Sequence, residues 1–243
     1  MTDNEKRLTA YHEAGHAIAT YYCPTQDPVH QISIIPRGMA GGFTMSLPSE
    51  DKSYRSRNEM LEEIVVLLGG RVAEALIIGD ISTGASNDIE RATKLVFSMV
   101  TKYGMSPKLG PMTYGSSDGD TFLGRDFGGR NYSEETAAAI DEEVKEYITN
   151  GYAQTEKILK DHTDRLHVVA KFLFEHEKMS GEQFAAAMEG KEIPMNVDEE
   201  DDDEASTVSE AEIIAEGKPE GEADDKGTSD EEKPESVTKK ETE

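Results

Sequence analysis

Two histidines and a glutamate near the N-terminus have the types and spacing of a metal-dependent hydrolase. His12, Glu13 and His16 form the pattern H-E-x-x-H. On a helix of 3.6 residues per turn the two histidines lie one turn apart on one face, so both imidazoles can bind one zinc ion. Glu13 is rotated by roughly 100° from His12, beside the metal, where it suits a general base. Zinc lowers the pKa of its bound water toward ~7, so the pattern predicts metal-assisted hydrolysis of a peptide bond.

The H-E-x-x-H pattern binds metal only on a helix, and the residues around it predict a helix. Thr2 and Glu5 are spaced as a capping box. Gly15 costs a helix about 1 kcal/mol relative to alanine, which makes sense if another segment must come close to the metal. Apolar residues at helical spacing run beside the histidines, namely Leu8, Tyr11, Ile18 and Tyr22. We therefore interpret the motif as a catalytic zinc site and not as a chance pattern on a surface helix.

Two acidic residues compete to be the third zinc ligand. Apolar spacing predicts a core helix over residues 56–78, and Glu74 falls near its end. Asn87 and Glu90 are spaced as a capping pair for the next helix. This puts Asp88 in the first turn, where the helix dipole keeps a carboxylate ionised. Glu74 can equally be a solvated side chain and Asp88 a favourable N-terminal charge, so spacing alone leaves both candidates open.

The remaining pattern predicts a mainly helical (α+β) domain with a small β-hairpin. Residues 29–35 and 43–47 read as its two strands, joined by a turn rich in glycine and proline. Further helices are predicted from Ser133 to about residue 159, with a break at Asn150–Gly151, then over residues 164–175 and from Ser180 onward. Gly69 and Gly70, inside the predicted core helix, suggest a close-packing point.

The predicted hairpin has two interpretations. Its open edge can take up an extended substrate through main-chain hydrogen bonds. The residues that we expect to contact such a peptide are Ile34, Ile35, Pro36, Arg37 and Gly38. Alternatively, the hairpin only covers one side of the core.

Composition separates a domain from a tail. Residues 197–243 contain 20 acidic and 5 basic residues and no aromatic residue. They cannot bury enough apolar surface to offset the entropy of ordering, so we expect a disordered acidic tail. Residues 1–196 hold all the aromatic residues, which predicts one compact domain.

Charge and motif content exclude several functions. A net charge of −25 argues against nucleic acid or an anionic membrane as a direct partner. No apolar run reaches the ~18 residues needed to cross a bilayer, so we expect this chain to be soluble, with no membrane insertion of its own. There is no G-x-x-x-x-G-K-[ST] loop, which predicts no ATP site. The single cysteine, Cys23, fits a reducing compartment such as the cytoplasm.

Several segments, in order, resemble the peptidase domain of FtsH, the membrane-anchored ATP-dependent zinc metalloprotease. They are RLTAYHEAGHA (7–17), IIPRG (34–38), LGGRVAE (68–74), STGASNDI (82–89), YGMS (103–106) and FLGR (122–125), and they span nearly all of residues 1–190. The resemblance implies that His12, His16 and Asp88 hold one zinc ion per chain. Glu13 is then the base, and Glu74 supports a ligand or packs between helices.

The resemblance also implies a larger assembly. Members of the FtsH family carry membrane spans and an AAA ATPase domain, so this chain resembles an excised peptidase domain, although Met1 also fits a natural stand-alone relative. The parent would be a homohexamer that degrades unfolded or damaged proteins at the cytoplasmic side of the cell membrane, in protein quality control. The alternative is a non-catalytic module with a structural zinc and an acidic tail that binds partners. Water as the fourth ligand would favour the enzyme, and a fourth side chain the module.

Overall fold

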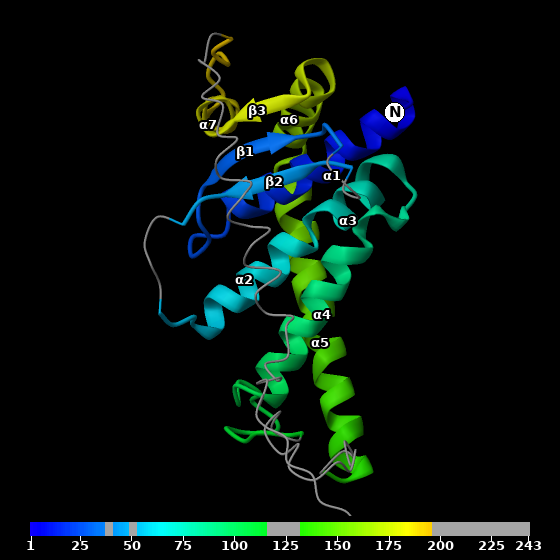
Figure 1. The fold of residues 1–243 in the computed structure, drawn as a ribbon, viewed down its shortest axis with the longest axis vertical. Coiled ribbons are helices and arrows are strands. Elements are labelled where there is room, and N and C mark those ends of the chain that lie inside the picture. The colour runs from blue at the N-terminus through cyan, green and yellow to red at the C-terminus, as the bar shows by residue number, and fades with distance from the viewer. Residues whose placement is uncertain (37–40, 49–52, 116–131, 196–243) are drawn as a thin grey trace, which may run out of the picture. The chain divides into compact units, whose positions relative to one another are not determined.

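The computed structural model describes residues 1–36, 41–48, 53–115 and 132–195; the predicted acidic tail, 197–243, lies outside them. Most of the described residues are helical, and three short strands form one antiparallel sheet (Figure 1). The mainly helical fold class predicted from the sequence is thus confirmed. The elements are α1 (Asp3–Tyr21), β1 (Val29–Ser33), β2 (Phe43–Ser46), α2 (Arg57–Leu67), α3 (Gly69–Ala73), η1 (Glu74–Ile78), η2 (Thr83–Ala85), α4 (Ser86–Thr101), α5 (Glu134–Asp161), α6 (Thr163–His176), β3 (Lys178–Ser180) and α7 (Gly181–Glu189).

Helix α1 lies at the centre of this fold. It begins at the predicted capping box, in which the Thr2 hydroxyl accepts from Glu5 N–H and the Glu5 carboxylate accepts from Thr2 N–H at 2.7 Å. It then packs against α3, α6 and β1, which bury nearly every residue from Ala10 to Thr20. The metal-binding pattern is therefore carried by a helix whose position is determined on several sides.

The sheet contains the predicted hairpin and one strand more. β1 is the middle strand and pairs with β2 on one side and with β3 on the other, so that Ile32 faces Thr44 and Met179 across the two ladders. The third strand, β3, was not predicted, because three residues show no clear alternation. β2 and β3 are therefore the outer strands of the sheet, and of the two it is β2 that packs against the motif helix (Figure 1).

The predicted helix over residues 56–78 is divided into three pieces. α2 ends at Leu67, α3 begins at Gly69, and the chain then widens into a π-helical turn, η1. The break lies where α3 crosses α1. A Cβ on Gly15 would lie 2.4 Å from the Gly69 carbonyl oxygen, and a Cβ on Gly69 would lie 2.7 Å from that of Gly15. The two glycines let the helix backbones touch, as the sequence suggested.

Two other helix predictions were wrong. Asn87 and Glu90 do not cap α4, because that helix begins at Ser86, directly after the short 3₁₀ turn η2, and has no side-chain cap. Asp88 still falls in its first turn. The break predicted at Asn150–Gly151 is absent, because α5 continues to Asp161. Gly151 is buried there against Ile64 of α2, so this glycine serves helix packing.

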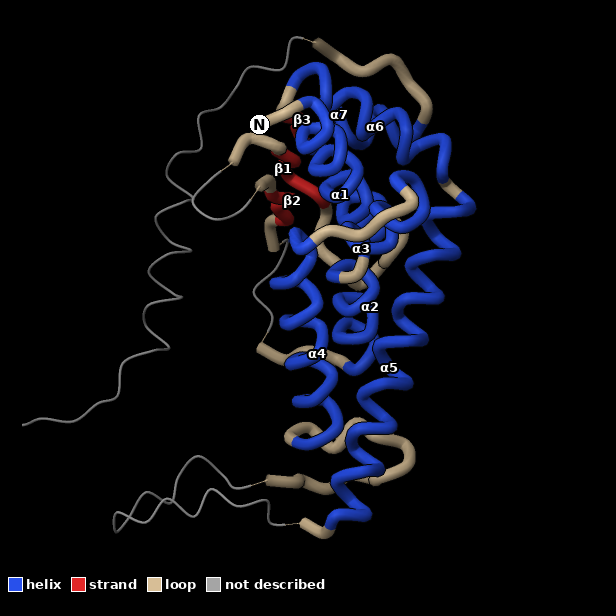
Figure 2. Tube along the Cα trace, turned by 90° about the vertical axis from the view of Figure 1, so that its right-hand side faces the viewer, coloured by secondary structure: helices blue, strands red, loops and turns tan. Residues whose placement is uncertain are grey.

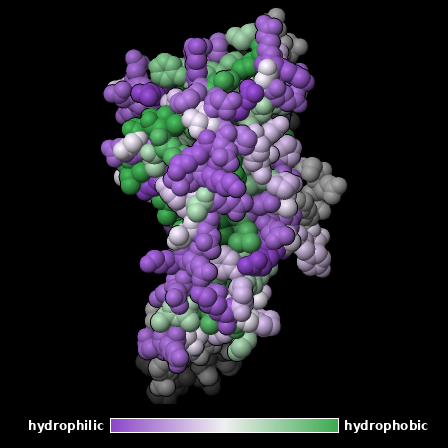
Figure 3. All heavy atoms as spheres, turned by 180° about the vertical axis from the view of Figure 1, so that it is seen from behind, coloured by the Kyte–Doolittle hydropathy of each residue, from purple (hydrophilic) through white to green (hydrophobic). Residues whose placement is uncertain are grey.

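Helices α4 and α5 run side by side below the sheet and bury an apolar seam that includes Val96, Met99, Val100 and Ile140 (Figure 2). The face seen in Figure 3 is mostly hydrophilic, with its apolar residues gathered in separate patches. None of the described helices combines the length and apolarity that a membrane span requires.

Candidate metal centre

Three donor atoms converge from two helices. α1 presents Nε2 of His12 and of His16, which lie 3.0 Å apart. The first turn of α4 presents Oδ2 of Asp88, 3.4 Å from the former nitrogen and 3.5 Å from the latter. In tetrahedral zinc sites with bonds of about 2.0–2.1 Å, two ligand atoms are separated by about 3.3 Å. The three observed separations therefore fit a single zinc ion held by these residues.

The hydrogen bonds behind the two rings expose the nitrogens that a metal needs. Nδ1 of His16 lies 2.8 Å from the Val66 carbonyl oxygen, which can only accept, so Nδ1 carries a proton and donates it. Nδ1 of His12 lies 2.8 Å from Oε1 of Glu74. In its neutral form each ring would direct an unprotonated Nε2 toward the other ring and toward Asp88. Three atoms that each offer a lone pair at such distances attract a cation, and a divalent metal ion is suited to this position.

In the metal-free protein the positive charge at this cluster is a proton on His12. Burial lowers the pKa of His12, but hydrogen bonds with Asp88 and Glu74 raise it, and the net result is a pKa of about 9. Burial alone would raise the pKa of both carboxylates. The hydrogen bonds to the histidines, with those from Ser82 to Glu74, instead hold the pKa of Asp88 and of Glu74 below its ordinary value. The electrostatics of the cluster thus favour positive charge at its centre.

Glu74 lies behind the metal centre. Its carboxylate is fully buried, and besides His12 it accepts from the backbone N–H of Ser82 at 2.7 Å and from the Ser82 hydroxyl at 3.0 Å. It therefore contacts the ring nitrogen that faces away from Asp88. Such a carboxylate holds the orientation of a ligating imidazole and raises its basicity.

Gly70 provides the space that His12 occupies. A Cβ on Gly70 would lie 2.4 Å from atoms of the His12 ring, so the backbone of α3 packs directly against the imidazole. Close backbone contacts therefore position His12. One is made by Gly70, and the other is the crossing of α1 and α3 at Gly15 and Gly69.

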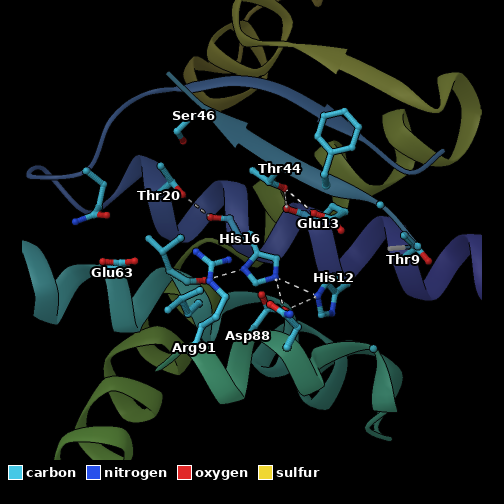
Figure 4. A pocket seen from close by; sticks show the side chains of 18 of the residues that line it. Thr9, His12, Glu13, His16, Thr20, Thr44, Ser46, Glu63, Asp88 and Arg91 are labelled. Atoms are coloured by element: carbon cyan, nitrogen blue, oxygen red, sulfur yellow. Dashed lines mark hydrogen bonds and ion pairs between the residues drawn. The ribbon is translucent and has the colours of Figure 1, made fainter. Parts of the chain in front are cut away.

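Glu13 lies on the other side of the two rings from Asp88. Figure 4 shows it facing β2, where Thr44 stands, whereas Asp88 faces the rings from α4. The glutamate is 6% exposed, and the Thr44 hydroxyl donates to its Oε2 at 2.8 Å. A carboxylate that lies beside the three donor atoms, but is not one of them, has the position that a general base requires.

A groove of about 1250 Å³ opens over this centre. Gly42, Thr44 and Ser46, within or next to β2, line it on one side, and Asp88 and Arg91 of α4 line it on the other (Figure 4). The metal cluster is thus accessible from a channel that runs beside the outer strand of the sheet.

Of the residues expected to contact a substrate, the three that the structure describes are not among those that line the groove. Ile34 is fully buried, and its N–H donates to the Glu177 carbonyl oxygen at 2.9 Å, so it offers no open edge to a peptide. Ile35 is half-buried and Pro36 exposed, while Arg37 and Gly38 lie outside the described residues. Among the described residues, the outer strand beside the metal centre is β2, because β1 is already paired on both sides.

Sequence reasoning identified four of the central residues and missed others. The structure places His12, His16 and Asp88 in one cluster, with Glu13 in the lining of the same groove, and Glu74 is adjacent. Thr44, Ser82 and the Val66 carbonyl were not anticipated. They act through contacts 8 to 50 residues apart along the chain, for which local spacing carries no signal.

These features define the class of the protein. Metallopeptidases carry H-E-x-x-H on a helix, with the glutamate as general base. Here α1 presents this pattern to Asp88 of α4, and a groove gives access to it. Comparison with known proteins agrees, since residues 1–187 match peptidase family M41. The chain belongs to this family.

Individual relatives are highly similar. The chain is 57% identical over 194 residues to ATP-dependent zinc metalloprotease FtsH 1 of Thermoanaerobacter sp. (strain X514), an alignment that covers 79% of this chain and 32% of that protein. It is 60% identical over 184 residues to FtsH of Caldicellulosiruptor bescii, covering 75% and 30%. It is 52% identical over 204 residues to FtsH 2 of Alkaliphilus metalliredigens, covering 84% and 30%. The chain thus spans about a third of the length of these relatives.

Proposed function

We propose that this chain is a zinc metalloendopeptidase domain that hydrolyses peptide bonds in unfolded polypeptides. The observation that carries the proposal is the set of three donor separations of 3.0, 3.4 and 3.5 Å beside a buried glutamate. Membership of peptidase family M41 and the names of the relatives support the same activity. The proposed domain comprises residues 1–196, with 197–243 as an acidic extension.

The proposed chemistry assigns a role to each residue. His12, His16 and Asp88 hold the zinc ion, which when bound activates a water molecule and polarises a carbonyl group. Glu13 accepts a proton from the attacking water and returns it to the leaving amine. Glu74 keeps the His12 ring in the tautomer that leaves Nε2 free to bind metal.

The number of ligands favours an enzyme over a structural module. Within the described parts of the chain, the candidate cluster has three members, His12, His16 and Asp88. Structural zinc is usually closed by four protein ligands, whereas a catalytic site keeps one position for water or substrate. Cys23 does not join the cluster, because its thiol is buried between α1 and α2, next to the Glu62 carbonyl.

The proposed substrate path follows β2. An extended peptide that adds to the outer edge of this strand would lie along the groove and pass the metal centre. Main-chain hydrogen bonds are independent of side-chain identity, so this mode suits a protease with broad specificity. Ile35 and Pro36, which continue from β1, stay candidates for contact with the same peptide.

The names of the relatives support a proposal about the parent protein. We place this domain in a parent that resembles the ATP-dependent FtsH proteases, where an AAA ATPase domain would unfold substrates and deliver them to the groove. We further propose a homohexamer at the cytoplasmic face of the membrane that acts in protein quality control.

A single substitution tests the proposed activity. Glu13→Gln removes the base but keeps the size of the side chain and the three ligands. We expect it to bind one zinc per chain and to lose casein hydrolysis by at least about 100-fold, the usual contribution of a general base. Glu156→Gln, at a solvated position of α5, is the matched control and should hydrolyse casein as the unmodified chain does. Undiminished turnover by Glu13→Gln would refute the assigned base.

A further inference from the structure

The contact between β2 and Glu13 points to a further residue of the catalytic machinery. Oγ1 of Thr44 lies 2.8 Å from Oε2 of Glu13 and 3.2 Å from the Glu13 carbonyl oxygen. Both acceptors belong to one residue of α1, while the donor belongs to the outer strand of the sheet. The sequence separation of 31 residues makes this a tertiary contact and not a local turn.

The backbone of the same strand confines the carboxylate further. A Cβ on Gly42 would lie 2.9 Å from Oε1 of Glu13 and 2.7 Å from the Ser33 carbonyl oxygen. Gly42 is therefore in contact with both the glutamate and β1, and a larger residue would displace one of them. Gly42 therefore limits the positions that the Glu13 carboxylate can occupy, and the hydrogen bond from Thr44 restrains its rotation about the terminal torsion.

The hydrogen bond also distinguishes the two oxygens of the carboxylate. Thr44 donates to Oε2, whereas the backbone at Gly42 borders Oε1. A proton taken from water would go to a carboxylate lone pair that this hydrogen bond leaves available. A terminal carboxylate torsion has broad energy wells, so without the hydroxyl the group would sample several rotations.

We propose that Thr44 is a positioning residue that holds the Glu13 carboxylate in its proton-accepting orientation. This inference rests on the proposed function, because it presumes that Glu13 is the base. It extends that function by coupling the base to the strand along which a peptide would add. Seating a peptide on β2 and orienting the base would then depend on the same four residues, Phe43–Ser46.

The test compares Thr44→Val with Thr44→Ser in the full chain, using casein and a quenched fluorescent peptide as substrates. Valine keeps the shape of threonine but cannot donate, whereas serine restores the donor. We expect Thr44→Val to lower kcat about tenfold or more, since misplaced catalytic groups lose large factors. KM should change less than about twofold, because peptide addition uses the main chain. Thr44→Ser should recover kcat to within about threefold of the unmodified chain.

Two further measurements separate positioning from structure. Zinc content of Thr44→Val should match that of the unmodified chain, because the hydroxyl touches no proposed ligand. The variant should unfold cooperatively, with a loss of stability no greater than one missing hydrogen bond usually causes. Thr149→Val, which removes an exposed hydroxyl bonded to the Lys145 carbonyl on α5, is the matched control and should not change kcat.

The outcomes are distinguishable. Unchanged kcat in Thr44→Val, with an active unmodified chain, would overturn the inference and leave the proposed function intact. Loss of zinc or of folding in Thr44→Val, or equal losses in the serine variant, would also overturn it, because a role in structure would then explain the effect. An unmodified chain that binds zinc but never cleaves casein or the peptide would overturn both.

Discussion

Glu74 and His12 form a buried pair in which the carboxylate lies 2.8 Å from Nδ1, the ring nitrogen that faces away from Asp88. This relationship separates the roles of the two acidic residues that compete for the metal in the sequence. Glu74 contacts Nδ1 of His12, and Asp88 lies near Nε2, the nitrogen that would bind the metal. The arrangement predicts different consequences for their removal.

Substitution of the two carboxylates should separate a ligand from its support. Asp88→Ala removes one of three ligands, so we expect the purified protein to lose stoichiometric zinc. Glu74→Ala should keep zinc at micromolar metal but weaken its affinity by about 10–100-fold, the usual effect of losing a hydrogen-bond partner of a ligating histidine. Inductively coupled plasma spectrometry and competition with a chelator measure both quantities.

Asp164→Ala provides the control for these variants, because Asp164 is an exposed acidic residue in the first turn of α6. It should bind zinc normally. Zinc retained by Asp88→Ala and lost by Glu74→Ala would exchange the two roles.

Zinc binding should depend on pH through His12. Its pKa is raised from an ordinary value of 6.5 to about 9 in the metal-free protein, by the hydrogen bonds with Asp88 and Glu74 acting against burial. The metal-free fold is therefore stabilised by this proton fully below pH 6.5, and the stabilisation is lost as pH rises through 9. Because zinc must displace the proton, its affinity should rise about tenfold per pH unit in that window.

Calorimetry in buffers of different ionisation enthalpy checks this prediction. About one proton should be released per zinc bound at pH 7.5, and release from this ring should vanish above pH 10. Affinity that stays constant between pH 6.5 and 9 would show that His12 is not protonated in the metal-free state.

Gly15→Ala should destabilise the domain although alanine favours helices. Alanine gains about 1 kcal/mol in helix propensity, but its Cβ would lie 2.4 Å from the Gly69 carbonyl oxygen, and this backbone atom cannot move independently of α3. Overpacking usually costs about 1–3 kcal/mol, so we expect a net loss of stability and a misplaced His16. Thermal unfolding should show a lower Tm.

Gly151→Ala is a useful comparison, because its Cβ would meet side-chain atoms of Ile64 and Leu68, which can adjust. Its loss of stability should be smaller than that of Gly15→Ala. A Gly15→Ala variant as stable as the unmodified protein would contradict the backbone contact.

Cys23 should be chemically inert in the folded protein. Burial raises the pKa of its thiol to about 12, with a smaller contribution from the nearby Glu62. An aromatic disulfide reagent at pH 8 should therefore react at least about 10³-fold more slowly with the folded protein than with the chain unfolded in guanidinium, because the thiolate is the reactive form. Removing zinc should not expose this thiol. Rapid reaction in the native state would contradict its burial.

Local signals predicted the local parts of the fold. The caps at Thr2, Ser133 and Ser180 involve partners three residues away, so each could be identified from spacing. The two motif histidines are one turn apart, and their convergence also follows from helix geometry. The resemblance to a known family supplied Asp88, which spacing alone could not distinguish from Glu74.

Tertiary contacts explain what could not be predicted. The break at Leu68 depends on the crossing of α1 and α3, and the pairing of β3 with β1 depends on the placement of α6. The role of Glu74 depends on which nitrogen of His12 faces it, and that of Thr44 on the register of β2. No residue pattern within a short window encodes these relationships.

The coordination of the metal itself tests the central proposal most directly. Crystals of the zinc-loaded protein, with data collected on both sides of the zinc absorption edge, should show one anomalous peak per chain. We predict Nε2 of His12, Nε2 of His16 and the Asp88 carboxylate as ligands, with a water molecule in the fourth position near Glu13. No zinc at this place, or a fourth protein side chain in place of water, would contradict a peptidase centre.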